Sequence, residues 1–349
     1  VLLKELGKLQ DAELSYRKAI DINPDFADAH SNLGVLLNDL GKLQDAELST
    51  RKAIELNPDF AKAHLNLGTI LRDLGQLQEA ELSTRKAIQL NPALAEAHCN
   101  LGTILNSLCK IQEAELYLRK AIELQPDFAN AYFNLSLIEL LKGNYQSGLD
   151  SYELRYELKK PSLLHSNPNI KRVKNEKIQE LEKLLVLSEQ GLGDTLHYMR
   201  YIPYLRSLGI DVSFCPQPKL NTLIKASAID LNPLTPAQAS LVSEGKWIQL
   251  LSLPRHLKVS PENPIISEPY ICSTNELVKK WKKIFSKEKR PIVAINWQGN
   301  PEMEKNYQGR SIPLETFSPL PEPNEITLLS LQKGFGSEQL EHCSFKNKF

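Results

Sequence analysis

The segments ADAHSNLG (27–34), AKAHLNLG (61–68), AEAHCNLG (95–102) and ANAYFNLS (129–136) follow one another at a spacing of 34 residues. Small residues such as Ala46 and Ala80, and glycines such as Gly41 and Gly75, keep the same step. Small side chains let two helices approach closely, and glycine tolerates the left-handed turn that ends a helix. One helix pair cannot bury its own apolar face, so we expect residues 1–158 to form a stack of antiparallel pairs.

The period, the leucine-glycine and alanine positions, and the proline that closes each unit are similar to the tetratricopeptide repeat. We count four full repeats after a partial repeat at residues 1–23. The last repeat departs from the pattern, with Ser136 in place of glycine and Arg155 in place of alanine. An atypical terminal repeat is expected where a solenoid meets solvent or another domain. We expect no strand before Leu181.

One asparagine recurs in each repeat, on the first helix, which we expect to line the inner curve: Asn32, Asn66, Asn100 and Asn134. Each amide offers a donor and an acceptor, so the row predicts a surface that holds an extended peptide. The alternative is that the amides bond only across neighbouring repeats or to water. The repeats resemble those of the O-linked N-acetylglucosamine transferase family, in which such asparagines contact peptide. That resemblance implies a protein or peptide acceptor in the repeat groove.

The 34-residue repeat pattern ends after about residue 160. Residues 159–183 read as a polar linker, with Lys171, Arg172 and Lys174 on a solvated face. Short apolar runs then alternate with helical patterns, which predicts a parallel sheet. We expect strands at 184–188, 210–214, 247–253, 291–297 and 326–332, and helices beginning at Thr195 and covering 220–227 and 275–285. The predicted domains are 184–286 and 287–349.

A Gly191-Leu-Gly193-Asp194 turn joins the first of these strands to a helix, at the strand end where such sheets bind ligands. Leu196 replaces the third glycine of a dinucleotide fingerprint, and no phosphate-binding Gly-Lys-Ser/Thr follows. On the residues alone, the favoured interpretation is that Asp194 caps the helix.

Residues 184–209, with Gly193, Asp194 and Pro203, resemble the opening of heptosyltransferase-type glycosyltransferases of the GT-B fold. The resemblance implies that Asp194 is the general base that activates an acceptor hydroxyl, beside the substrate-binding residues Gly191, Gly193 and Thr195. His197 is a second candidate, or else a neutral packing residue.

The segment INWQGNPEMEKNYQGRSIPLETFSPL (295–320) resembles the start of the donor-binding domain of the same enzymes. The resemblance implies a nucleotide-sugar site, in which Arg310 neutralises the diphosphate; the alternative is a surface arginine. The other implied donor contacts are Trp297, Gln298, Gly299, Asn300, Ser311, Gln332 and Lys333.

We therefore expect an α-solenoid followed by α/β, with GT-B-like Rossmann halves, the second incomplete. The expected function is cytoplasmic transfer of a hexosyl or heptosyl group from a nucleotide-sugar to a protein or glycan hydroxyl. The alternative is a non-catalytic peptide-binding scaffold with a relic α/β domain. Since the sequence begins inside a repeat and ends within the donor region, we expect a fragment truncated at both ends and inactive by itself.

The composition of the chain limits the classes of partner that it is expected to bind. The 349 residues carry 42 Lys+Arg and 42 Asp+Glu, and this balance argues against a nucleic-acid partner. No apolar run reaches the ~20 residues of a membrane span. The five cysteines form no C-x-x-C pair, which favours isolated thiols over zinc, and without a D-x-D motif we expect neither metal nor cofactor.

Overall fold

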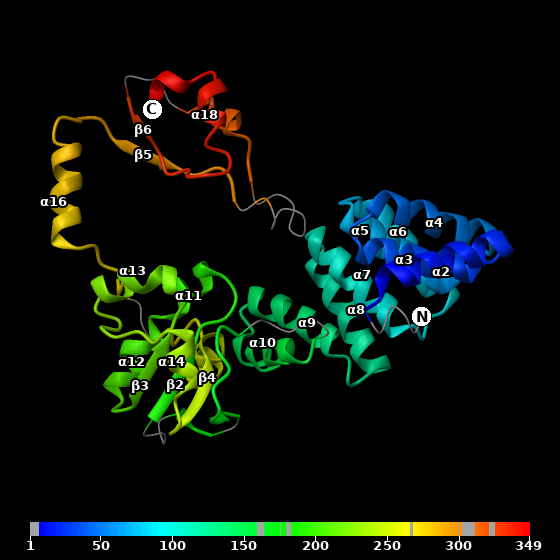
Figure 1. Ribbon diagram of the computed structural model, residues 1–349, viewed down its shortest axis with the longest axis horizontal. Coiled ribbons are helices and arrows are strands. Elements are labelled where there is room, and N and C mark those ends of the chain that lie inside the picture. Colours follow the sequence, from blue (N-terminus) through cyan, green and yellow to red (C-terminus); the bar gives the residue numbers. More distant parts are fainter. Residues whose placement is uncertain are drawn as a thin grey trace. The chain divides into compact units, whose positions relative to one another are not determined.

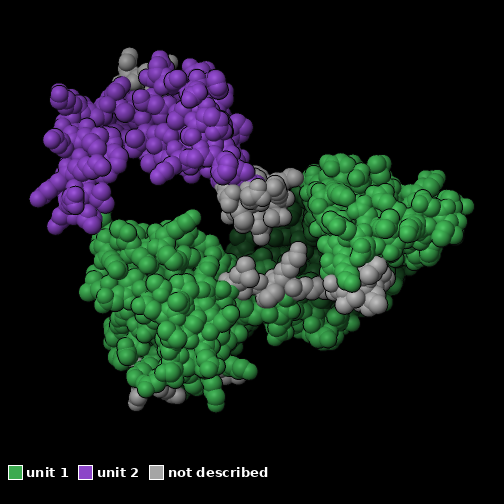
Figure 2. Space-filling model, in the orientation of Figure 1, with its two compact units in different colours: residues 1–273 green, residues 274–349 purple. Residues whose placement is uncertain are grey.

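The computed structural model describes residues 7–158, 164–174, 176–178, 183–265, 268–299, 301, 311–320 and 325–349. The chain divides into two compact units, Val1–Ser273 and Thr274–Phe349 (Figure 2). Within the described ranges, every helix is too short or too polar to cross a lipid bilayer.

The N-terminal part of the first unit is the expected helical solenoid (Figure 1). Each hairpin closes on a residue of positive φ, at Gly41 (75°), Gly75 (79°), Cys109 (59°) and Gly143 (85°). Its helices are α2 (Leu9–Ile22), α3 (Ala27–Asp39), α4 (Leu43–Leu56), α5 (Ala61–Asp73), α6 (Leu77–Leu90), α7 (Ala95–Ser107), α8 (Ile111–Leu124), α9 (Ala129–Leu141) and α10 (Tyr145–Tyr152). The 3₁₀ helix η1 (Glu153–Tyr156) follows directly.

Small residues set the distance between the two helices of each hairpin. A Cβ added to Gly68 would lie 2.1 Å from Thr84 Oγ1 and 3.2 Å from the carbonyl oxygen of Ala80. Ala80 itself is fully buried. The pattern of small residues therefore acts as expected, because larger side chains at these positions would push the helices apart.

The contacts between hairpins reveal the direction of curvature. The first helices pack on one another, α3 on α5, α5 on α7 and α7 on α9, whereas the second helices α4, α6 and α8 are linked mainly by long side chains such as Arg51 and Arg85. The first helices therefore line the inner side of the curve, and the second helices splay apart on the outer side.

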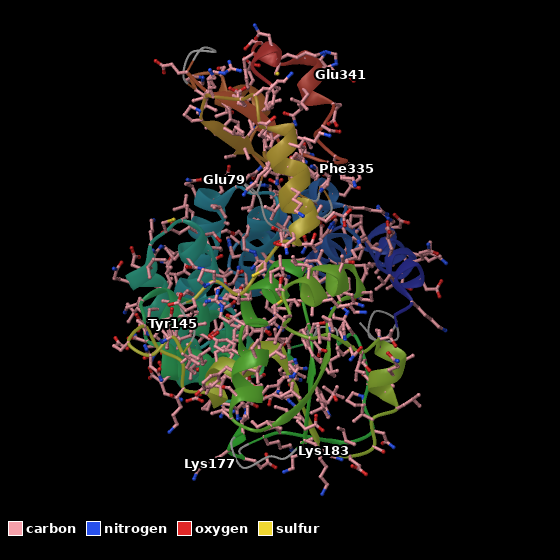
Figure 3. All side chains as sticks on the ribbon, turned by 90° about the vertical axis from the view of Figure 1, so that its left-hand side faces the viewer. Glu79, Tyr145, Lys177, Lys183, Phe335 and Glu341 are labelled. Carbon is pink, nitrogen blue, oxygen red and sulfur yellow. The ribbon has the colours of Figure 1, made fainter. Side chains whose placement is uncertain are left out.

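The rest of the first unit is a four-stranded parallel sheet with the order β1-β4-β2-β3. Lys183, labelled in Figure 3, marks the amino end of β2. The strands are β1 (Lys171–Arg172), β2 (Lys183–Leu187), β3 (Asp211–Cys215) and β4 (Lys246–Gln249). The helices are α11 (Leu192–Tyr198), α12 (Tyr201–Ser207), η3 (Pro218–Leu220), α13 (Asn221–Ala226), α14 (Pro236–Ser240), η4 (Leu250–Ser252) and α15 (Leu253–His256). Val186, Phe214 and Ile248 lie in its core.

Four expectations about this region are wrong. The segment expected to be a linker supplies β1, so a strand precedes Leu181. Lys171 and Lys174 are exposed as expected, but Arg172 is half-buried and bonds Gln249 Oε1 at 2.9 Å. The strand expected over 247–253 ends at Gln249 and turns into η4. The helix expected from Thr195 begins at Leu192 and breaks between α11 and α12, since Pro203 has no N–H for the carbonyl one turn earlier.

The second unit is a small α/β body. It contains α16 (Asn275–Ile284), β5 (Ile292–Ile295), η5 (Leu314–Phe317), β6 (Thr327–Ser330), α18 (Gln339–His342) and η6 (Lys346–Lys348). Strands β5 and β6 pair in parallel, with Ala294 opposite Leu329. Ile295, Trp297 and Leu328 belong to its core. The chain is thus a helical solenoid followed by α/β structure.

Candidate functional site

A groove opens on the outer side of the solenoid, between α4 and α6, with α5 as its floor. Its volume is about 510 Å³, within the size range of ligand pockets. The apolar lining comes from Ile54, Leu67, Leu71 and Leu82, and the polar and charged lining from Arg51, Glu55, His64, Glu79, Ser83 and Lys86. Leu82 is 69% exposed and lies at the edge of this groove.

One residue explains why this groove is open. Ser83 is small and donates its hydroxyl to the carbonyl oxygen of His64 at 2.9 Å. The next repeat has Tyr117 at this position, stacked on His98 with 5.9 Å between ring centroids. Arg85 also donates to the Tyr117 hydroxyl at 2.8 Å. The tyrosine side chain therefore occupies the space that the serine leaves empty one repeat earlier.

The asparagine row lies on the inner helices, and three of its four amides bond to the preceding repeat. Asn66 Nδ2 donates to Ser31 Oγ at 3.0 Å, and Asn134 Nδ2 donates to Thr103 Oγ1 at 3.1 Å. Asn100, 8% exposed, accepts from Arg72 at 2.9 Å. Asn32 is half-buried. Side-chain hydrogen bonds of the row thus connect neighbouring hairpins. Among the described residues, the Oδ1 atoms of Asn66 and Asn134 have no hydrogen-bond partner.

The histidine of the repeated motif also has a packing role. Nε2 of His30, His64 and His98 lies 2.9 Å from the carbonyl oxygen of Pro24, Pro58 and Pro92, respectively. The ring ties the first helix to the turn that precedes it, which accounts for its recurrence at the 34-residue step.

Arg155 joins the solenoid to the α/β sheet. Its side chain is fully buried and donates to both carboxylate oxygens of Glu189, at 2.8 and 3.2 Å. It also donates to Ser252 Oγ at 2.9 Å and lies over the rings of Tyr152 (4.5 Å) and Tyr156 (4.2 Å). Burial raises the pKa of the Tyr156 hydroxyl, which donates to Glu189 at 2.5 Å. Arg155 of the atypical terminal repeat therefore packs the end of the solenoid against the sheet.

The Gly191–Asp194 turn follows Glu189 at the carboxyl end of β2. Asp194 Oδ2 accepts from the Gly191 N–H at 3.0 Å, so this half-buried carboxylate caps α11. Thr195 is buried and donates to Gln217 Oε1 at 2.6 Å, and Gln217 Nε2 donates to the Gly191 carbonyl at 3.2 Å.

His197 is exposed on the same helix, with its ring edge-on to Tyr198 at 4.8 Å. Partial burial and Arg200 lower the pKa of its imidazole, and the negative charge of Asp194 opposes this shift. The structure thus brings Gly191, Asp194 and Thr195 together. Glycines 191 and 193 are exposed, and both polar backbone groups of Gly191 are already hydrogen-bonded.

In the second unit, Gln332 connects the ends of β5 and β6. Its Oε1 accepts from the N–H groups of Trp297 (3.2 Å) and Gln298 (2.9 Å), and its Nε2 donates to the Gln298 carbonyl at 3.1 Å. Gly299 N–H donates to Ser311 Oγ at 3.0 Å. Gln332 Nε2 also donates to the backbone carbonyl of Phe335 in the turn that follows; Phe335 is labelled in Figure 3.

Other residues of the expected donor site are arranged differently. Trp297 is 2% exposed, and its Nε1 donates to the Gly336 carbonyl at 2.9 Å, so its ring is a core element. Lys333 is exposed. Asn300 and Arg310 lie outside the described residues.

Sequence reasoning missed the outer groove and the partners of Arg155. The groove carried a signal, because the exposed leucine recurs at Leu14, Leu48, Leu82 and Leu116 with the repeat period. Gln217 was also missed, although it follows β3 at the ligand-binding edge of the sheet. Nothing in the sequence pairs Arg155 with Glu189, which lies 34 residues later.

Comparison with known protein families supports the repeat assignment. Models described as tetratricopeptide repeat match residues 27–60, 95–128 and 50–81, and a model described as TPR repeat matches residues 2–41. These matched models include no glycosyltransferase. No curated protein matches the chain.

Three similar solved structures each align with less than half of the chain. MamA is 26% identical, with 44% of this chain and 91% of that chain covered and a TM-score of 0.39. PilF of Pseudomonas aeruginosa is 25% identical, with 44% and 69% covered and a TM-score of 0.41. YrrB, described as a TPR protein with an unusual peptide-binding site, is 23% identical, with 45% and 81% covered and a TM-score of 0.36. The N-terminal part of this chain, through residue 128, therefore consists of tetratricopeptide repeats.

Proposed function

We propose that the chain is a protein-binding scaffold and that the groove between α4 and α6 holds a short segment of a partner protein. The observation that carries this proposal is the open volume of about 510 Å³ floored by Leu67 and Leu71 and flanked by the exposed Leu82. Leu67 and Leu71 are already buried, so the gain comes from the exposed Leu82, at about 25 cal/mol per Å² of apolar surface that a ligand removes from water.

The charges around the groove define the partner segment. Arg51 and Lys86 supply positive charge, and Glu55 and Glu79 supply negative charge. Arg51 Nη2 bonds Glu79 at 3.1 Å, so one rim pair already bridges α4 and α6. The occupant that fits is a short peptide with a large aliphatic side chain and charged residues of both signs beside it.

The inner asparagine row, Asn32, Asn66, Asn100 and Asn134, is the second peptide-binding surface of this proposal. The Oδ1 atoms of Asn66 and Asn134 are acceptors for the backbone N–H groups of an extended chain. Because their donor groups bond to neighbouring helices, a peptide on this face would be held by the acceptor atoms alone, which favours weak binding.

The test begins with selection of binding peptides from a random display library on the whole chain. A selected peptide is then titrated, by fluorescence anisotropy, into wild type, Leu82→Glu, Leu116→Glu and the quadruple Asn→Ala variant of the inner row. Leu116→Glu is the matched control, since Leu116 is 65% exposed at the same repeat position but lies beside the space that Tyr117 fills. Both leucines are exposed, so neither change should alter folding.

We expect Leu82→Glu to weaken binding at least about tenfold, since loss of one buried leucine is worth about 1.5–3 kcal/mol. Leu116→Glu should bind like wild type. A peptide affected only by the inner-row variant, with the melting temperature of that variant near wild type, would place the site on the inner face instead. Failure to select any peptide, or equal binding by all variants, would overturn the proposal.

A second candidate is glycosyl transfer, favoured by the position of Asp194 at the carboxyl end of β2 beside the exposed glycines 191 and 193. Here Asp194 is the base that accepts the proton of an acceptor hydroxyl, with His197 and Thr195 beside it. Trp297, Gln298, Gly299, Asn300, Arg310, Ser311, Gln332 and Lys333 would form the donor side for a nucleotide-sugar. Because its ring is buried, Trp297 would support the donor site from the core rather than touch the nucleotide-sugar.

Asp194→Asn tests this candidate. Asparagine keeps the bond to the Gly191 N–H but cannot accept a proton, so transfer from a labelled nucleotide-sugar should fall at least ~100-fold while the melting temperature stays near wild type. Unchanged transfer would leave Asp194 as a helix cap only.

A further inference from the structure

Helix α16 (Asn275–Ile284) has an apolar face that stays exposed among the described residues of its own unit. Thr274 caps the helix by accepting from the Leu277 N–H at 3.2 Å. Every residue of α16 is exposed, including Leu277 (45%), Trp281 (45%) and Ile284 (52%). The Trp281 ring stacks on Phe285, with 5.5 Å between centroids, so the apolar side chains form one continuous patch.

The lysines of α16 border this patch on both sides. At 3.6 residues per turn, Leu277, Val278, Trp281 and Ile284 occupy roughly one third of the helix circumference. Lys280 and Lys282 flank that arc, and Lys279 and Lys283 occupy the opposite face. A helix with this division is typical of segments that lie in a lipid–water interface.

Charge is concentrated around α16, although the whole chain has a formal net charge of zero. Arg290 pairs with Glu288 at 2.9 Å. Across residues 275–290 this leaves six lysines and one acidic residue, Glu276. A covering surface must therefore be both apolar and anionic.

An isolated helix of ten residues is marginal in water, so a covering surface also stabilises α16. We propose that α16 is a peripheral anchor for anionic lipid surfaces, with Trp281 at headgroup depth and Lys280 and Lys282 against lipid phosphates. A plane fits this helix better than a protein groove does, because cations flank the apolar arc symmetrically and long lysine side chains reach up to a headgroup layer.

The experiment uses the whole chain and vesicles of phosphatidylcholine, alone or with about one third phosphatidylserine. Cosedimentation measures binding. Tryptophan emission reports Trp247, Trp281 and Trp297 together, so the part of a shift that is lost in Trp281→Phe is the part due to Trp281. We expect at least about tenfold tighter binding to the anionic vesicles, a blue shift of the emission, and loss of both at high salt. The variant Trp281→Phe should bind but lose the blue shift.

Lys280→Glu combined with Lys282→Glu should weaken binding at least about 30-fold, since each lysine near the surface contributes about fivefold. The matched control is Lys62→Glu combined with Lys225→Glu, which makes the same charge change at exposed lysines of the first unit. Equal losses in both variants would mean attraction by overall charge and would overturn the anchor. So would binding to soluble polyglutamate without binding to vesicles, which would instead indicate an acidic protein partner. Peptide binding at the solenoid groove is unaffected by any of these outcomes.

Discussion

Replacing Arg155 with methionine should destabilise the first unit severely. The guanidinium is fully buried and donates to Glu189, whose side chain is also fully buried, and to Ser252. Methionine fills much of the same volume but leaves the Glu189 carboxylate without its cation. Removing one partner of such a buried pair costs about 3–5 kcal/mol. At about 2–4 °C per kcal/mol for a unit of this size, the melting temperature should fall by roughly 6–20 °C.

The assay is urea unfolding followed by circular dichroism, with Arg255→Met as control. Arg255 crosses the same junction and pairs with Asp150 at 2.6 Å, but both side chains are partly exposed, so this change should cost about 0–1 kcal/mol. Adding Glu189→Gln to Arg155→Met should recover part of the lost stability, because no buried charge is left unpaired. The reasoning is refuted if Arg155→Met costs no more than Arg255→Met, or if the Arg155 and Glu189 changes are additive.

Three further predictions concern the solenoid and its junction. Cys109→Gly should stabilise the chain by about 1 kcal/mol, because Cys109 holds a φ of 59° that favours glycine; an unchanged urea midpoint would contradict this. Ala80→Leu should destabilise by about 1–3 kcal/mol, since Ala80 is fully buried where Gly68 brings two helices together, and a thermal melt equal to wild type would show that the hairpin can expand. Burial raises the pKa of the Glu153 carboxyl, but Arg155, Ser252 and Arg172 outweigh it and hold the pKa below its usual 4.5. This stabilisation is present above about pH 4.5 and is lost as pH falls through the folded value, so Glu153→Gln should flatten the acid side of a stability-against-pH series; a parallel curve would reject the assignment.

The sequence predicted the solenoid well because its determinants are local and repeated. A glycine or small residue at a fixed phase sets each turn and each close approach, as at Gly41 and Gly68, and the structure has the helices at that step. The alternation of strands and helices also predicted a parallel sheet correctly. Element ends were less predictable, since the break before Pro203 and the end of β4 at Gln249 depend on packing as well as on pattern.

Only the tertiary structure decided which residues meet. The sequence marked Arg155 as a departure from the repeat, but its partner Glu189 belongs to a strand end that folding brings to it. The asparagine row was visible in the sequence, whereas its bonds to preceding helices required the curvature of the stack. The groove beside Leu82 exists because the second helices splay apart and because Ser83 is too small to fill the gap. Periodicity determines local conformation, but cavities and buried charge pairs arise from contacts between distant segments, which no single stretch of sequence encodes.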